Sequence, residues 1–229
     1  MKKILLWVVL IVFVIACGDD SDNTMYVNGS IKGLKKGTLY LQKEMDSLLV
    51  SVDSVFVDGT DSFILTDEIS SPEMYFLTLG TSDKKIAFFG EKDTVYVKST
   101  LDKFILKAKI SGSENQARLD EFYDMTKKFN DQNLDLIKEE FEARKIGSQD
   151  SIDAVAKKMN GWTRRKYLYM TNFAVKNGDY EVSPYVALTE LADANVTLLD
   201  TINNSLSTEV RASKYGKQLN DYIKAIKEN

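Results

Sequence analysis

The chain has 229 residues, of which 44% are hydrophobic and 28% are charged. Its formal net charge is −4 and no basic stripe stands out, so the composition argues against a nucleic-acid-binding protein. Histidine is absent, which removes the commonest general base, the commonest zinc ligand and every Ser-His or Cys-His nucleophile. Catalysis would have to rest on Asp, Glu, Lys, Ser or Tyr.

Residues 1–16 have the pattern of a secretory signal peptide. Lys2 and Lys3 precede an uncharged apolar run of about 13 residues, whereas a membrane-spanning helix needs roughly 20. The end of that run, Val14–Cys17 (VIAC), resembles a bacterial lipobox, in which the cysteine receives a lipid before cleavage. We therefore predict cleavage after Ala16 and stable membrane anchoring through acyl chains on Cys17. A short anchor helix that is never cleaved is the alternative.

A polar tether over residues 17–24 is expected next, because this segment lacks the apolar residues that would offset the entropy of ordering. Residues 25–112 then show short alternating stretches separated by turn residues. About eight such strands predict an antiparallel β-sandwich or open barrel. Asp58-Gly59 is a turn signal of the kind that closes hairpins. The expected strands cover residues 26–31, 38–42, 48–57, 62–65, 74–79, 85–89, 94–98 and 104–110.

Residues 113–229 change to helical periodicity. Ser113 and Gln116 resemble a capping box at the start of the first helix, and Gly147-Ser148 separates it from a second helix that ends near Asn177. Pro184 is expected at the first position of a third helix, and a last helix is expected over residues 207–226. The chain is therefore predicted to be α+β, with a C-terminal helical bundle after the β-rich part. The first helix should bury one face formed by Leu119, Phe122, Phe129, Leu136, Ile137 and Phe141.

Clusters of charged residues give no candidate catalytic, cofactor-binding or metal-binding site. Asp19–Asp22 lacks the closing bidentate acid of a calcium loop, and Asp58–Asp61 is explained by turn chemistry. Glu139–Glu142 and Arg164–Lys166 are interpreted as solvated helix faces. Cys17, as a lipid attachment site, is the one functional residue that we predict.

The aromatic residues of the β-rich part leave two interpretations open. One sheet face could carry an aromatic platform that stacks on a sugar or a peptide, or the same rings could fill the core of the sandwich. The residues concerned are Tyr26, Tyr40, Tyr75, Phe76, Phe88, Phe89 and Tyr96.

Several short motifs make the chain similar to Bacteroidota lipoproteins that carry the domain of unknown function DUF4369. The motifs in the β-rich part are Val27–Ile31 (VNGSI), Val52–Val55 (VDSV), Val57–Gly59 before Phe63, and Ile110–Asn115 (ISGSEN). In the helical part, Ser183–Leu188 (SPYVAL) and Ser213–Gly216 (SKYG) resemble the segment that precedes a thioredoxin-like domain in longer relatives. That redox domain and its Cys-x-x-Cys pair are missing here, so the resemblance implies an accessory region and not a reductase or peroxidase.

The resemblance also implies a subcellular localisation. Acidic residues after a lipidated cysteine resemble a Bacteroidota signal for export to the cell surface, and Gly18–Asp22 fits that pattern. We expect a lipid-anchored outer-membrane protein, with the periplasmic and surface faces both open and the surface favoured. The leading functional hypothesis is a non-catalytic binding or scaffold module for an envelope protein or glycan. An accessory that docks a separate thioredoxin-like protein comes second, and a carboxylate-type glycan hydrolase third.

Overall fold

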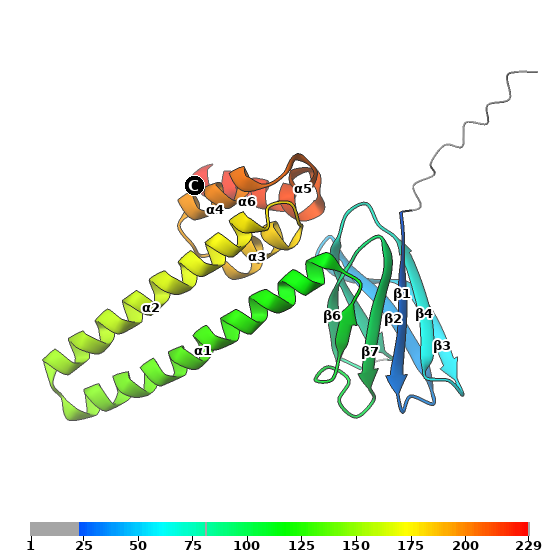
Figure 1. The fold of residues 1–229 in the computed structure, drawn as a ribbon, viewed down its shortest axis with the longest axis horizontal. Coiled ribbons are helices and arrows are strands. Elements are labelled where there is room, and N and C mark those ends of the chain that lie inside the picture. The colour runs from blue at the N-terminus through cyan, green and yellow to red at the C-terminus, as the bar shows by residue number, and fades with distance from the viewer. Residues whose placement is uncertain (1–22, 81, 229) are drawn as a thin grey trace, which may run out of the picture.

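The computed structural model describes residues 23–80 and 82–228, and over these residues the chain is an α+β protein as predicted. A sandwich of two four-stranded sheets is followed by a helical region (Figure 1). The strands are β1 (Thr24–Lys32), β2 (Lys36–Met45), β3 (Leu48–Asp58), β4 (Ser62–Glu68), β5 (Glu73–Leu79), β6 (Lys85–Gly90), β7 (Asp93–Thr100) and β8 (Lys109–Ser111). The helices are α1 (Glu114–Ile146), α2 (Gln149–Lys176), α3 (Val182–Glu190), α4 (Val196–Ser205), α5 (Thr208–Ala212) and α6 (Lys214–Glu228).

The two sheets have the orders β4-β1-β7-β8 and β3-β2-β5-β6, which we call sheet A and sheet B. All pairs are antiparallel except β1 with β7, which run parallel and depart from the predicted antiparallel pattern. The β8 strand is also shorter than expected. Residues 101–107 form turns, in which Phe104 is buried and its carbonyl accepts a 2.6 Å hydrogen bond from the Ser99 hydroxyl. The prediction of a strand from residue 104 was therefore wrong at its start.

The Asp58-Gly59 turn exists, with Gly59 at a φ of 77°, but it does not close a hairpin. It carries the chain from β3 in sheet B to β4 in sheet A, so two successive strands lie in different sheets. The Asp53 carboxylate links them, since it accepts a 2.8 Å hydrogen bond from the backbone N–H of Thr66. This bond accounts for Asp53 in the VDSV motif as a structural residue.

The core of the sandwich consists of the inward-facing residues of both sheets, such as Val27, Leu41, Leu65 and Val97. Gly29 of the VNGSI motif lies where a Cβ atom would stand 2.4 Å from the Phe63 ring and 2.5 Å from the Val97 carbonyl oxygen. Only glycine fits there, because it lets a neighbouring ring lie directly on the backbone.

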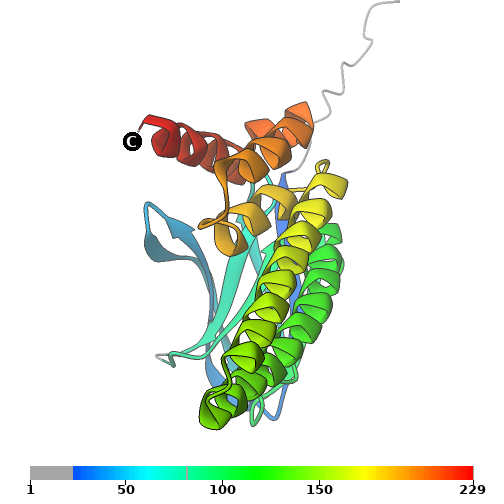
Figure 2. The same ribbon diagram turned by 90° about the vertical axis from the view of Figure 1, so that its left-hand side faces the viewer.

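Two long helices, α1 and α2, form an antiparallel hairpin that extends from the sandwich (Figures 1 and 2). The helix break lies at Gly147-Ser148 as predicted: Gly147 ends α1 in the left-handed conformation, and the Ser148 side chain caps α2. At the start of α1, Ser113 Oγ accepts from the N–H of Gln116 at 2.9 Å. The second half of the capping box is absent, because Gln116 Oε1 instead accepts from the N–H of Phe89 in β6.

The structure corrects several expectations for the helices and one for the tether. Ile137 and Phe141 do not share the buried face of α1: their exposed fractions are 47% and 67%. Pro184 is the third residue of α3, still within the first turn, where a missing N–H costs nothing. The expected last helix is divided into α5 and α6, and α4 was not predicted. Thr24, which we assigned to the tether, is already the first residue of β1.

The helical core includes two residues of sheet B, Met74 and Phe89, beside Leu119, Phe122 and Tyr215 of the helices. Phe89 packs edge-on against Tyr185 and Tyr215, with ring centroids 5.3 and 6.2 Å apart. The helices therefore pack on the outer face of sheet B, and the two halves share an apolar interface. None of the described helices is long and apolar enough to cross a membrane.

Candidate functional site

A cleft of about 720 Å³ lies where the end of the β2–β3 hairpin stands beside the helices. Its lining residues come from the β2–β3 hairpin, from β5, and from α3 and α6. Its apolar lining includes Met45 of β2, Phe76 of β5, and Tyr185 and Leu188 of α3. Charged lining residues are Lys43, Glu44, Asp46, Glu73 and Lys214.

The hairpin end is held by a two-residue turn, Asp46-Ser47, between the paired residues Met45 and Leu48. Both turn residues have positive φ, 49° and 65°, as a type I′ hairpin turn requires. Glycine or asparagine normally takes such positions, and serine rarely does. Unusual backbone conformations of this kind concentrate at functional sites, so this turn makes the end of the hairpin a candidate part of one.

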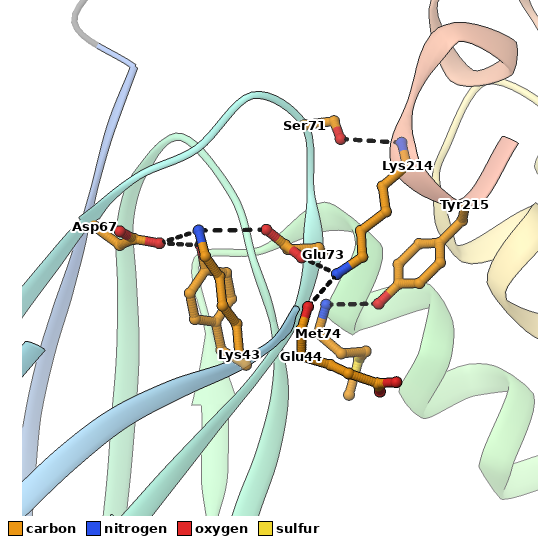
Figure 3. A network of polar contacts seen from close by, with 9 residues as sticks. Lys43, Glu44, Asp67, Ser71, Glu73, Met74, Lys214 and Tyr215 are labelled. Atoms are coloured by element: carbon orange, nitrogen blue, oxygen red, sulfur yellow. Dashed lines mark hydrogen bonds and ion pairs between the residues drawn. The ribbon is translucent and has the colours of Figure 1, made fainter. Parts of the chain in front are cut away.

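A polar network connects the hairpin to both sheets below the cleft (Figure 3). Lys43 Nζ lies 2.5 Å from Asp67 Oδ2 and 3.5 Å from Glu73 Oε1. The Tyr75 hydroxyl donates to the same Asp67 oxygen at 2.6 Å. Burial, and after it the hydrogen bond to Asp67, raise the pKa of Tyr75 well above its ordinary value. Tyr75 is therefore a hydrogen-bond donor at neutral pH and not a base.

The same network continues into α6 through Lys214 and Tyr215 (Figure 3). Lys214 Nζ forms a 2.5 Å ion pair with Glu73 Oε2 and donates to the Glu44 carbonyl oxygen at 2.7 Å. The hydroxyl of Tyr215 accepts a 3.0 Å hydrogen bond from the N–H of Met74. Burial raises the pKa of Tyr215, so this phenol also stays protonated. Glu73 thus stands between two ammonium groups and attaches α6 to sheet B.

A second hollow, of about 840 Å³, lies on the other side of Lys214 and is lined by several acidic residues. Glu181 is buried there, and burial raises its pKa, with a smaller contribution from the charges of Glu91 and Glu209. Two of these carboxylates have structural partners. Glu181 accepts from the side-chain amide of Asn115 at 3.2 Å, and Glu91 accepts from the N–H groups of Glu114 and Asn115 at 3.1 and 2.5 Å. Glu91 therefore caps the start of α1, and Glu181 links α1 to the start of α3.

Asp58–Asp61, Glu139–Glu142 and Arg164–Lys166 do not line the cleft, and Asp19–Asp22 lies outside the described residues. Glu139 pairs with Lys158 across the helical hairpin, and Glu140 pairs with Arg144 along α1. No cluster of three or more potential metal-binding acids or cysteines occurs among residues 23–80 and 82–228. Cys17, the predicted lipidation site, lies outside the described residues, as do the predicted signal peptide and most of the tether.

The aromatic residues of the β half divide between the two interpretations. Tyr75, Phe88 and Phe89 are fully buried, so they are core residues. Tyr26 and Tyr96 are exposed on the outer face of sheet A, and Tyr40 and Phe76 are half-buried on sheet B. Phe76 alone of the seven lines the cleft.

The sequence did not indicate the other cleft residues. Lys43 is more than 100 residues away from Tyr185 and Lys214 in the sequence, and no local pattern predicts that the three meet. One signal existed: Tyr185 and Lys214 lie in the SPYVAL and SKYG motifs. Gly216 of the second motif has the Val210 carbonyl oxygen 2.0 Å from where a Cβ atom would stand, which explains the glycine by close packing.

Comparison with known proteins identifies the β half. Residues 25–119 match the family model of a domain of unknown function, DUF4369. No curated protein and no solved structure matches the chain. The match begins in β1 and ends in the second turn of α1, soon after the residues that Glu91 caps. The sandwich and the start of α1 therefore correspond to the DUF4369 domain that the sequence motifs predicted.

Proposed function

We propose that this chain is a membrane-anchored lipoprotein that acts as a non-catalytic binding or scaffold module for a protein or glycan partner. Lipid on Cys17 would provide the anchor, and the cleft beside the β2–β3 hairpin would provide the binding site. The observation that carries the binding role is the pairing of charges below the cleft, where Glu73 and Asp67 are both neutralised by lysines of the same chain.

Paired charges favour binding over catalysis for a physical reason. A general acid or base needs access to the substrate and a pKa near the working pH. Asp67 and Glu73 are instead held in ion pairs, and the buried phenols of Tyr75 and Tyr215 have raised pKa values. What the cleft offers a ligand is the apolar surface of Phe76 and Leu188 with polar groups around it, which is the usual composition of a binding site.

The shape of the chain is consistent with a scaffold held at a membrane. Asn23, the first described residue, lines the acidic hollow near the start of α1. The 33 residues of α1 extend about 50 Å from that end. A lipid on Cys17 would hold the Asn23 end near an outer membrane and leave the far end of the hairpin available to other proteins, on either the periplasmic or the surface face.

Site-specific photo-crosslinking in intact cells tests the binding role. A photoreactive residue at Leu188 in the cleft is expected to give one reproducible crosslinked partner. The same residue at the exposed position Ile64, on the outer face of sheet A, serves as the control. Equal crosslinking at both positions, or none at Leu188 with no glycan retained by the purified chain, would contradict the proposal.

The anchor is tested separately. Cys17→Ser is expected to abolish incorporation of a clickable palmitate analogue and to release the chain from the membrane fraction. Ser21→Ala, four residues away, should leave both unchanged. Membrane retention of an unlabelled Cys17→Ser variant would instead favour an uncleaved anchor helix.

A further inference from the structure

The strand β3 has an open edge near the β2–β3 turn. It is the end strand of sheet B, and β2 is its hydrogen-bonded neighbour. On its other side, the Asp53 carboxylate reaches Thr66 of β4, but among the described residues no backbone group pairs with residues 48–52. A stretch of five residues therefore presents unused N–H and C=O groups at a sheet edge.

This open edge lacks the features that normally protect one. Natural proteins place charges, prolines or a covering segment on an edge strand because an unprotected edge pairs with other chains. Residues 48–52 (LLVSV) contain no charge and no proline. Leu48, Leu49 and Val50 have exposed fractions of 69%, 37% and 38%. Large apolar side chains thus lie exposed on both faces of a strand whose backbone is free to pair.

The charges around the edge indicate what kind of strand fits. The carboxylates of Glu44 and Asp46 form no hydrogen bond or ion pair within the described part of the chain. The lysines beside them are already paired: Lys43 with Asp67 and Glu73, and Lys214, which donates to the Glu44 carbonyl oxygen, with Glu73. The turn end of the hairpin is therefore negative, whereas the edge itself is neutral. A complementary strand has apolar residues in its middle and a basic residue beside the turn.

We propose that residues 48–52 of β3 bind an extended segment of another protein as a fifth strand of sheet B. Main-chain hydrogen bonds would supply affinity, and alternate side chains would supply specificity, as in other cases of strand addition. Leu48 and Val50, whose partners on β2 are Met45 and Lys43, offer one apolar face, and Leu49 offers the other. The tight Asp46-Ser47 turn holds this edge in place before binding, which lowers the entropic cost.

This inference rests on the proposed binding function and specifies it: the partner is an extended polypeptide and not a glycan. The hairpin is also one side of the cleft, so a segment that continues beyond the turn would pass from the β3 edge toward Phe76 and Leu188. A second copy of this chain is the competing occupant of an uncharged edge, and the test distinguishes it.

The test uses the full-length chain in detergent and fluorescent peptides of alternating Val and Thr that carry Lys at one end. Fluorescence anisotropy is expected to show binding of the Lys-ended peptide and none of a version with a central proline. Val50→Lys should weaken binding at least about tenfold, by placing a charge on the edge. Phe56→Lys, an exposed position farther along β3, should leave affinity unchanged. Leu49→Lys repeats the test if Val50→Lys lowers the melting temperature.

Two further measurements make the result specific to the edge and to the charge. Peptide binding should slow amide hydrogen exchange at residues 48–52. The double variant Glu44→Gln, Asp46→Asn should weaken the Lys-ended peptide and not a Glu-ended one. Equal binding of the proline peptide, equal losses at positions 50 and 56, or unchanged exchange at 48–52 would overturn strand addition.

The outcome is separable from the proposed function. If the free chain sediments as a dimer that Val50→Lys dissociates, the edge binds a second copy and the proposed heterologous strand is wrong. If crosslinking at Leu188 persists while the edge variants have no effect, the binding function stands and strand addition alone fails.

Discussion

The near and far halves of the α1–α2 hairpin differ sharply in how they are stabilised. In the near half, residues 114–129 and 162–176, Phe122 is fully buried and its ring packs 5.0 Å from that of Phe173. In the far half, residues 130–161, Ala143 and Val155 are the buried residues, whereas Leu134, Ile137 and Phe141 are exposed. One pair of continuous helices therefore joins a packed region to an arm that has almost no core.

The difference shows that helical periodicity predicts a helix and not the burial of its apolar face. The far half has only the seam between two helices and exposed ion pairs such as Lys158–Glu139, which contribute little. It remains helical because elongation from an existing helix is easier than nucleation. Local opening should therefore be far easier in the arm than near the sandwich. Matched substitutions in the two halves test this view.

The largest difference is expected between two phenylalanines of α1. Phe122→Ala removes a fully buried ring and should lower the free energy of unfolding by about 3–5 kcal/mol. Phe141→Ala removes an exposed ring and should change it by less than about 0.5 kcal/mol. Urea denaturation followed by circular dichroism measures both. Similar losses at the two positions would mean that the arm is packed against something in the native protein.

Two helical glycines should respond to alanine with opposite signs. A Cβ atom at Gly216 would lie 2.0 Å from the Val210 carbonyl oxygen, so Gly216→Ala should destabilise the protein by about 1–3 kcal/mol. At Gly161, in the far half, the nearest atom is the end of the flexible Arg165 side chain at 3.5 Å. Gly161→Ala should therefore stabilise by about 0.5–1 kcal/mol through helix propensity. Thermal melts would contradict this if both changes acted in the same direction.

Two partly exposed glutamates should also differ in how much their removal destabilises the protein. Glu91 accepts hydrogen bonds from the Ser113 hydroxyl and from two N–H groups at the start of α1. Glu91→Ala should cost about 1–2 kcal/mol, since it removes both a cap and a negative charge at a helix N-terminus. Glu140→Ala breaks an exposed pair with Arg144 and should cost less than about 0.5 kcal/mol. Chemical denaturation of both variants gives the comparison.

The sequence predicted the parts of the fold that depend on local pattern. Alternation located most strands, and Gly147-Ser148 and Asn177 located helix ends, because turn and cap chemistry acts within a few residues. What it could not predict depends on distant partners. The parallel pairing of β1 with β7, and the crossing of the chain between sheets after Asp58-Gly59, follow from how the sheets pack and not from either segment alone.

The cleft could not be predicted from the sequence, because it too depends on distant partners. Lys43 and Lys214 are unremarkable lysines until Glu73 brings them together from β2 and α6. Phe76 is one aromatic among seven, and only the position of the helices separates it from the core rings. The β3 edge was visible as a Val- and Ser-rich strand, but its exposure depends on the sheet order, which leaves it at the end of sheet B.

The smallest expected effect concerns Glu181, in the acidic hollow beside the near half. Burial raises its pKa above the ordinary value, so between those two values the folded state holds more protons than the unfolded state. The free energy of unfolding therefore falls as pH rises through that window. Glu181→Gln removes the buried charge and should raise the melting temperature by roughly 2 °C at pH 8, with the gain vanishing toward pH 4. Glu142→Gln on the exposed arm should show no such trend. A gain at position 181 that is the same at both pH values would mean that shape, and not charge, determines the stability of this hollow.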